Sequence, residues 1–213
     1  NNESIVSVRH LNEFQTFIRH SQAVPIIRKV ISKNENNMSQ QVSSRKPFGL
    51  PTNARPTKKG DIVLRWNDGE GPYFRKDIEV GVELIDKWKV ITSYVGYDHA
   101  GNPGKDGKRR VFSKIDILPP GTICTETYLV VGSYDNEKYA INLVNYMKTK
   151  FFRFLVSQFM YSHHITKESY SLVPQLDMTK NWTDQKLYAR YGISIEEQAF
   201  IETKIKSMDP SNE

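Results

Sequence analysis

The chain has 213 residues, a net charge of +6 and a single cysteine, Cys124. This length suits one or two domains. One cysteine excludes an intrachain disulfide, and no apolar run approaches the roughly 18–20 residues of a membrane-spanning helix. We therefore expect neither a secretory signal peptide nor a membrane anchor, and predict a cytoplasmic protein. A start at Asn1 rather than Met indicates a piece of a longer protein.

The positive charge is concentrated in the first two thirds of the chain. Residues 1–150 hold 23 Lys and Arg against 16 Asp and Glu, a balance of +7, whereas residues 151–213 hold 7 against 8, a balance of −1. A basic region of this kind suits a polyanionic partner, most simply nucleic acid. The alternative is an ordinary solvated basic surface.

The first third of the chain predicts short elements and one polar loop. Ser4–His10 and Glu13–His20 have the composition of two short strands. Val24–Ser32 is typical of a short helix, because Pro25 stands where the first helical turn tolerates proline. Lys33–Ser44 is rich in Asn, Ser and Gln and predicts a loop without stable structure.

Two strands and a short helix are predicted before the central region. Asp61–Trp66 alternates as a strand does, and Asn67–Gly71 has turn chemistry. Val80–Lys87 predicts a short helix. Trp88–Val95 has the β-branched and aromatic content of a strand.

The most apolar region, residues 121–160, predicts a strand followed by helix. Thr122–Val131 is rich in residues that fit a pleated surface, so Cys124 within it should be a small buried side chain. Asp135 can cap the next helix. Two apolar sets then follow at helical spacing: Ala140, Ile141, Val144, Met147, and Phe151, Phe152, Phe154, Leu155, Val156, Phe159.

The last fifty residues predict two helices, Trp182–Tyr191 and Ile193–Ser207. Gly192 is suited to end the first helix with a positive φ. Ser194 and Glu197 form the capping box that starts the second. Its expected apolar stripe is Ile195, Phe200, Ile201, Ile205.

These elements predict an α+β fold. We expect one mixed sheet containing Trp88–Val95 and Thr122–Val131, packed by the helical segment 136–160 and followed by the two C-terminal helices. Two parts are predicted: residues 1–160 as an α/β domain, and residues 161–213 as a helical extension packed on it.

No catalytic motif is complete. The chain lacks a phosphate-binding glycine loop, a zinc ligand set and a nucleophile elbow. Asn102-Pro103-Gly104 lacks the second proline and the aromatic residue of an adenine-methyltransferase loop. Glu202-Thr203-Lys204 leaves open a Mg²⁺-dependent nuclease. The apolar run Phe151–Phe159 leaves open a surface for docking a protein partner.

Two Gly- and Pro-containing basic loops, Arg45–Gly60 and Tyr97–Arg110, are the best candidates for binding DNA. Arg and Lys neutralise phosphates or read guanine, and Asn can read adenine. Basic residues near the bend of the central helix could add backbone contacts. The predicted DNA-binding residues are Arg45, Lys46, Asn53, Arg55, Lys58, Lys59, Lys105, Lys108, Arg109, Arg110, Lys148, Lys150 and Arg153; no catalytic or metal-binding residue is predicted.

Several segments, in order, resemble one protein family. The segments are IRHSQAVPIIRKV, SSRKPFGLPTN, CTETYLVVGSYDN, NYMKTKFFRFLVSQF, YSLVPQLDM and WTDQKLYARYGISIEEQAFIETKIKSM. Together they resemble the C-terminal region of adenine-specific DNA methyltransferases of bacterial Type II restriction–modification systems, including enzymes fused to a nuclease. The likeness runs over nearly the whole chain, and loops 33–44, 54–80 and 97–112 are its weakest parts.

The resemblance implies a division of labour. In that family an upstream core carries the S-adenosylmethionine loop and the Asn-Pro-Pro-aromatic motif, and it methylates N6 of a flipped adenine. The C-terminal region grips the duplex, so the resemblance implies that residues 1–160 are a DNA target-recognition domain. This chain would then bind double-stranded DNA and the upstream core of the same polypeptide, hold no cofactor itself, and have no catalytic activity alone.

Overall fold

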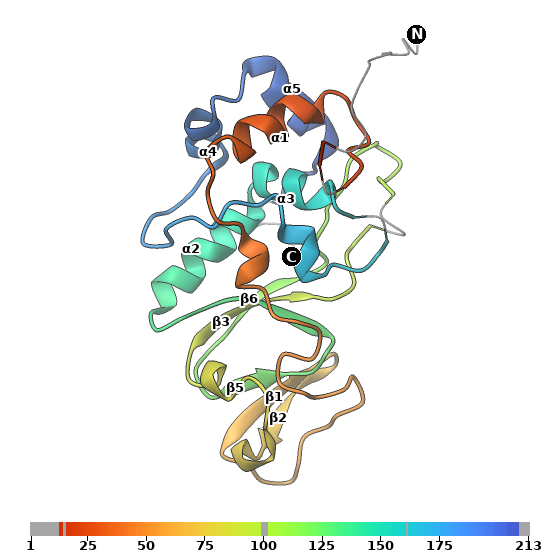
Figure 1. The fold of residues 1–213 in the computed structure, drawn as a ribbon. Coiled ribbons are helices and arrows are strands. Elements are labelled where there is room, and N and C mark those ends of the chain that lie inside the picture. Colours follow the sequence, from red (N-terminus) through yellow and green to blue (C-terminus); the bar gives the residue numbers. More distant parts are fainter. Residues whose placement is uncertain (1–12, 15, 99–101, 161, 209–213) are drawn as a thin grey trace.

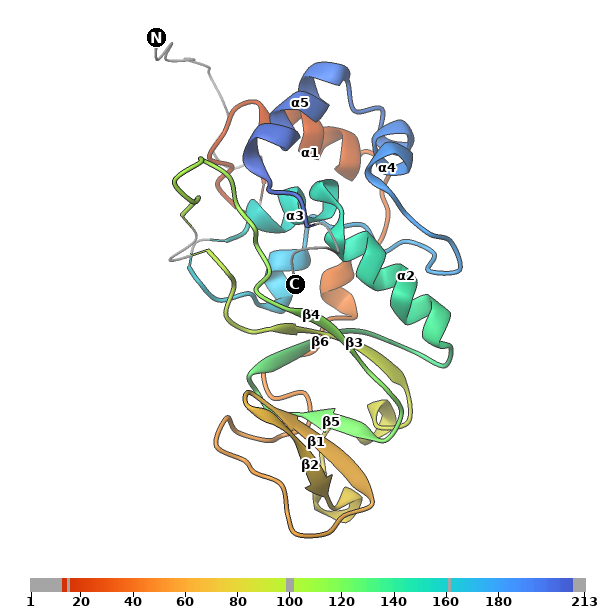
Figure 2. The same cartoon turned by 180° about the vertical axis from the view of Figure 1, so that it is seen from behind.

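Helices, one sheet and a second sheet form three successive layers in the computed structural model (Figures 1 and 2). The structure describes residues 13–14, 16–98, 102–160 and 162–208. The predicted strand Ser4–His10 lies outside these residues. The helices gather at one end of the molecule, the sheet β4-β3-β6 lies in the middle, and the sheet β2-β1-β5 forms the other end.

The strands form two three-stranded sheets. The strands are β1 Ile62–Trp66, β2 Gly69–Tyr73, β3 Trp88–Ser93, β4 Ile115–Leu118, β5 Thr122–Cys124 and β6 Tyr128–Tyr134. In the first sheet β1 pairs antiparallel with β2 and parallel with β5. In the second, β3 pairs antiparallel with both β4 and β6. The α+β class is confirmed.

A mixed sheet is present, but the strand that we expected over Thr122–Val131 is two strands, which belong to different sheets. A turn, closed by the Tyr128 amide donating to the Thr125 carbonyl at 3.1 Å, separates β5 from β6. The hydroxyls of Thr125 and Thr127 hydrogen-bond at 3.0 Å across the same turn. The chain therefore passes from the first sheet to the second at this point, and only β6 joins β3.

The α-helices follow the predicted order. They are α1 Ala23–Ile31, α2 Glu137–Lys148, α3 Lys150–Ser157, α4 Asp184–Tyr191 and α5 Ile195–Lys204. Gly192 ends α4 with φ of 60°, and Ser194 and Glu197 form the capping box of α5, as predicted. Asp135 does not cap α2; Asn136 does, since its side chain accepts from the Lys138 amide at 2.9 Å.

Five local predictions need correction. The described part of Glu13–His20 contains no strand, and Val80–Lys87 contains only the 3-10 helix Val82–Leu84. Gly69–Tyr73 is a strand where a turn was expected through Gly71. Lys33–Ser44, predicted as a loop without stable structure, packs against the rest of the protein, because Met38 and Val42 are buried. Ile195 is 79% exposed, so it is not part of the apolar stripe of α5.

Two hydrophobic cores hold the layers together. The larger lies between the helices and the sheet β4-β3-β6, and it includes the fully buried Phe151, Phe152 and Phe154 of α3. These residues therefore form core rather than a docking surface. The smaller core lies between the two sheets and contains Cys124. Apolar side chains from both sides of residue 160 enter the larger core, and the division into two parts there stays a prediction.

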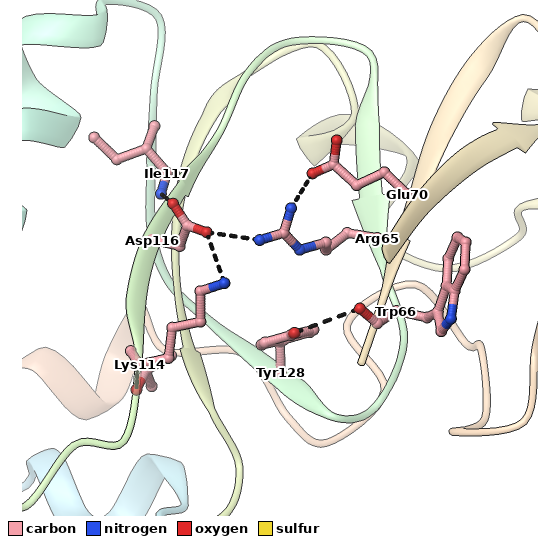
Figure 3. Close-up of polar contacts among 8 residues, drawn as sticks. Arg65, Trp66, Glu70, Lys114, Asp116, Ile117 and Tyr128 are labelled. Carbon is pink, nitrogen blue, oxygen red and sulfur yellow. Dashed lines mark hydrogen bonds and ion pairs between the residues drawn. The ribbon is translucent and has the colours of Figure 1, made fainter. Parts of the chain in front are cut away.

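A polar seam also joins the two sheets (Figure 3). From β1, Arg65 donates to Asp116 of β4 at 2.9 Å and forms an ion pair with Glu70 of β2. Lys114 lies 3.4 Å from the same Asp116 carboxylate, and Tyr128 of β6 donates to the Trp66 carbonyl at 3.5 Å. The seam fixes the position of one sheet on the other.

Candidate nucleic-acid interface

A short segment, Tyr94–Tyr97, continues from β3 and lies between two other stretches of chain. Its backbone accepts from the Ile165 amide at 2.8 Å and donates from Gly96 to the His163 carbonyl at 2.7 Å. Tyr97 donates to the Val111 carbonyl at 3.1 Å. A Cβ at Gly96 would lie 3.0 Å from the Val111 carbonyl oxygen, so the close approach favours glycine.

This segment connects the two basic loops. The Arg45 guanidinium carbon lies 4.9 Å from the Tyr94 ring centroid, and that of Arg110 lies 4.9 Å from the Tyr97 ring centroid. Arg45 begins the first loop and Arg110 ends the second. Both loops accordingly run along one side of the molecule, at the right in Figure 1 and at the left in Figure 2.

The base of the first loop is held by one carboxylate. Glu126 accepts from the Thr52 amide at 3.0 Å and from its hydroxyl at 3.2 Å. The same carboxylate lies 3.1 Å from Arg45 and 3.7 Å from Lys46. The Thr52 bonds, with the two cations, lower the pKa of Glu126 despite partial desolvation. Phe48 and Leu50 are buried in the smaller core.

The tip of the first loop is exposed and has no acidic residue between positions 45 and 60. Its exposed polar residues are Asn53, Arg55, Lys58 and Lys59. Arg55 donates to the carbonyls of Thr52 and Ala54, each at 2.9 Å, which leaves its remaining guanidinium donors available. The returning half packs on β2, where a Cβ at Gly71 would lie 2.7 Å from Pro56.

The second loop combines one exposed and three half-buried cations with internal anchors. Asp98 accepts from the amides of Arg110 and Val111, at 3.1 and 2.9 Å. The Arg109 backbone exchanges hydrogen bonds with Lys204 and Lys206 at the end of α5. Burial lowers the pKa of the Arg109 side chain, which is only partly exposed. Lys105 is exposed and Lys108 is half-buried.

Arg153 is wrongly predicted as a DNA contact, because its side chain is 0% exposed. Its guanidinium donates to the carbonyl of Lys148, at 3.2 and 3.1 Å, and to that of Thr149 at 3.3 Å. The Lys148 carbonyl is one that the end of α2 leaves without an intrahelical partner, whereas that of Thr149 also accepts from the Arg153 amide at 3.3 Å. Burial lowers the pKa of Arg153 to about 10. Arg153 therefore caps α2.

Lys148 and Lys150 belong to another part of the surface. They line a shallow pocket with residues of α4 and α5 and with Trp182, which precedes α4. Lys150 is ion-paired with Glu202. The structure thus brings Arg45 and Arg110, one end of each loop, to the Tyr94–Tyr97 segment, where neither of these two lysines has a contact.

A pair of histidines belongs to the interface and was not predicted. The His164 ring stacks on Tyr94 with centroids 4.6 Å apart and planes at 22°. The His163 ring centroid lies 3.9 Å from that of His164. The sequence offers no local signal for this arrangement, since it depends on the bridge between Val95 and His164.

The nuclease alternative finds no support in the geometry. Among the described residues, no group of three or more His, Cys, Asp or Glu side chains lies close enough to hold a metal ion. Glu202 is paired with Lys150, and the Lys204 ammonium lies 5.4 Å from the Phe200 ring centroid.

Within the described part of the chain, every helix is too short or too polar to span a membrane.

Comparison with known proteins identifies no relative. A scan against protein-family models, a search of curated proteins and a search of solved structures each found no match. The resemblance to adenine methyltransferases therefore rests on the sequence segments alone.

Proposed function

We propose that this chain binds duplex DNA as the target-recognition region of an adenine-specific DNA methyltransferase. The observation that supports this most directly is the link between the two basic loops. Tyr94 and Tyr97, three positions apart, contact Arg45 and Arg110 respectively. Cations from two separate stretches of chain are thereby presented on one side, as a phosphate backbone requires.

The chemistry of the loops suits both positioning and base reading. The exposed Lys58, Lys59 and Lys105 suit phosphate contacts, which orient a protein on the duplex without carrying sequence information. Asn53 and Arg55, at the tip of the first loop, are residue types that read adenine and guanine edges in the major groove. Sequence recognition is therefore assigned to the first loop.

In this proposal the chemistry of methyl transfer lies elsewhere. S-adenosylmethionine and the flipped adenine belong to an upstream core of the same polypeptide. This chain binds the duplex and selects the target sequence. Its partners are duplex DNA and the upstream core, and its location is the cytoplasm. No residue of this chain is assigned to the cofactor or to a metal.

Fluorescence anisotropy with a labelled duplex of roughly 20 base pairs tests the proposal. We expect non-specific binding with dissociation constants of about 10⁻⁴–10⁻⁶ M at physiological salt. The affinity should fall steeply as the salt concentration rises. The double variant Arg45→Gln, Arg110→Gln should bind more weakly and reduce the slope of log K against log salt by about 1 per lost phosphate contact. The double variant Arg28→Gln, Lys180→Gln removes the same two charges away from the loops and is the matched control; Arg28 is paired with Glu13 and Lys180 with Asp177. Salt-independent binding, or equal affinity in both variants, would contradict the proposal.

A further inference from the structure

The two histidines beside the Tyr94–Tyr97 segment give the interface a further property. We propose that binding of a polyanion at this segment is coupled to the uptake of a proton by the pair His163–His164. This inference rests on the proposed function and adds a regulation to the same surface. It predicts that affinity for DNA rises as the pH falls.

The two histidines lie in a row of neighbouring planar groups, here called the column, which also contains the Tyr94 ring and the Arg45 guanidinium. Arg45 lies over the Tyr94 ring, His164 stacks on the same ring, and His163 contacts His164. His163 is exposed and His164 is half-buried. A charge gained by either imidazole therefore adds to that of Arg45 at the point where the first basic loop begins.

The charged groups around the column are two cations and two carboxylates, and among them Arg45 is the one that acts on His164. The first loop contributes Arg45, whose carboxylate partner is Glu126. The segment after the histidines contributes Lys167 and Glu168, which line a shallow pocket with Arg45 and Tyr94. Lys167 and Glu168 are exposed, so water screens both of them.

These surroundings favour the neutral imidazole while no anion is bound. Burial, His163 and Arg45 together lower the pKa of His164 below its ordinary value of 6.5. At neutral pH this ring is consequently uncharged. A phosphate placed against Arg45 would offset the repulsion and favour the protonated ring, because an opposite charge nearby raises the pKa of an imidazole. Binding should then take up a proton, and by linkage acid should strengthen binding.

Calorimetry in two buffers of different ionisation enthalpy counts the protons directly. The probe is the same duplex, titrated at about pH 6.5, close to the ordinary histidine pKa. We expect uptake of a substantial fraction of one proton by the unaltered chain. We also expect affinity to rise by up to about tenfold per pH unit for each proton coupled, at constant ionic strength.

Variants separate protonation from stacking. In the double variant His163→Gln, His164→Phe, a ring still covers Tyr94 but neither side chain titrates. We expect this variant to fold, as judged by circular dichroism, and to take up almost no proton when it binds DNA, so that its affinity no longer rises as the pH falls. His20→Gln, whose ring instead meets Phe200 with centroids 5.9 Å apart, should keep the parent's proton uptake.

The outcomes distinguish this inference from the proposed function. DNA binding with no proton uptake, or with uptake that survives in the double variant, overturns the inference and leaves the proposed function standing. No binding heat and no anisotropy change at any pH overturns the proposed function, and this inference falls with it. Proton uptake that disappears only in the double variant supports both.

Discussion

Two buried cations in this protein are held by backbone carbonyls rather than by carboxylates. Arg153 caps α2, and Lys89 has an exposure of 0%. The Lys89 ammonium donates to the carbonyls of Ile85, Lys87 and Pro119 at 2.8, 2.6 and 3.2 Å. It thereby ties the start of β3 to the turn that precedes β5. A basic residue in a sequence is consequently no guide to a basic surface until its burial is known.

Replacing Lys89 by Met should destabilise the fold by about 3 kcal/mol, because buried carbonyls would lose their donor. Urea denaturation measures this, with the exposed Lys180→Met as control. Burial lowers the pKa of Lys89 from 10.5 to about 8. Between pH 8 and 10.5, Lys89 is protonated in the unfolded chain but largely deprotonated in the folded one. Raising the pH therefore favours the folded state, so the free energy of unfolding of the parent, relative to that of the variant, should rise with pH. A constant difference across that range would contradict the assignment.

At the scale of elements, the junction between α2 and α3 depends on a residue distant in sequence. Asp184, the first residue of α4, accepts from the amides of Lys150 and Phe151 at 3.0 and 2.8 Å. Its carboxylate thus satisfies two donors that the first turn of α3 leaves free. The pattern of residues 136–160 predicts helix with a bend, and Thr149 caps α3 locally, but the pattern cannot reveal Asp184, because that partner comes from another helix.

Asp184→Ala should cost about 1–2 kcal/mol of stability, since two amides at a helix N-terminus lose a charged acceptor. Thermal and urea unfolding measure the loss. Asp135→Ala is the matched control: its side chain is 86% exposed and its ion pair with Lys87 is a surface one, worth about 0–1 kcal/mol. Equal losses in the two variants would show that the capping contacts contribute little.

The elements that could be predicted are those with local signals. The helix α1, the strands β1 and β3, and both C-terminal helices follow from periodicity, turn chemistry and caps. The strand β2 could not be predicted, because GEGPY has little β-propensity and exists as a strand through pairing with β1. The division between β5 and β6 was missed because suitable residues continue across the turn at Thr125.

At the scale of the whole molecule, the candidate interface could be predicted only in part. Composition identified the two basic loops, whose exposed lysines and arginines are visible in the sequence. Their meeting at Tyr94–Tyr97 depends on contacts between segments far apart in the chain, including those of His163 and Val111. Such contacts follow from the layered packing (Figures 1 and 2) and leave no trace in local pattern.

Because the loops lie on one side, the position of a charge should matter more than the net charge. We compare two variants with the same change in net charge: Lys58→Glu, Lys59→Glu at the tip of the first loop, and Lys180→Glu, Lys186→Glu near α4. The loop variant should weaken DNA binding by more than about tenfold, since it places repulsive charges against the phosphates. The control should change affinity by less than about threefold at 0.15 M salt, where the Debye length is roughly 8 Å. Anisotropy at that ionic strength measures both. Equal weakening would mean that the whole molecule's charge attracts DNA without a localised interface.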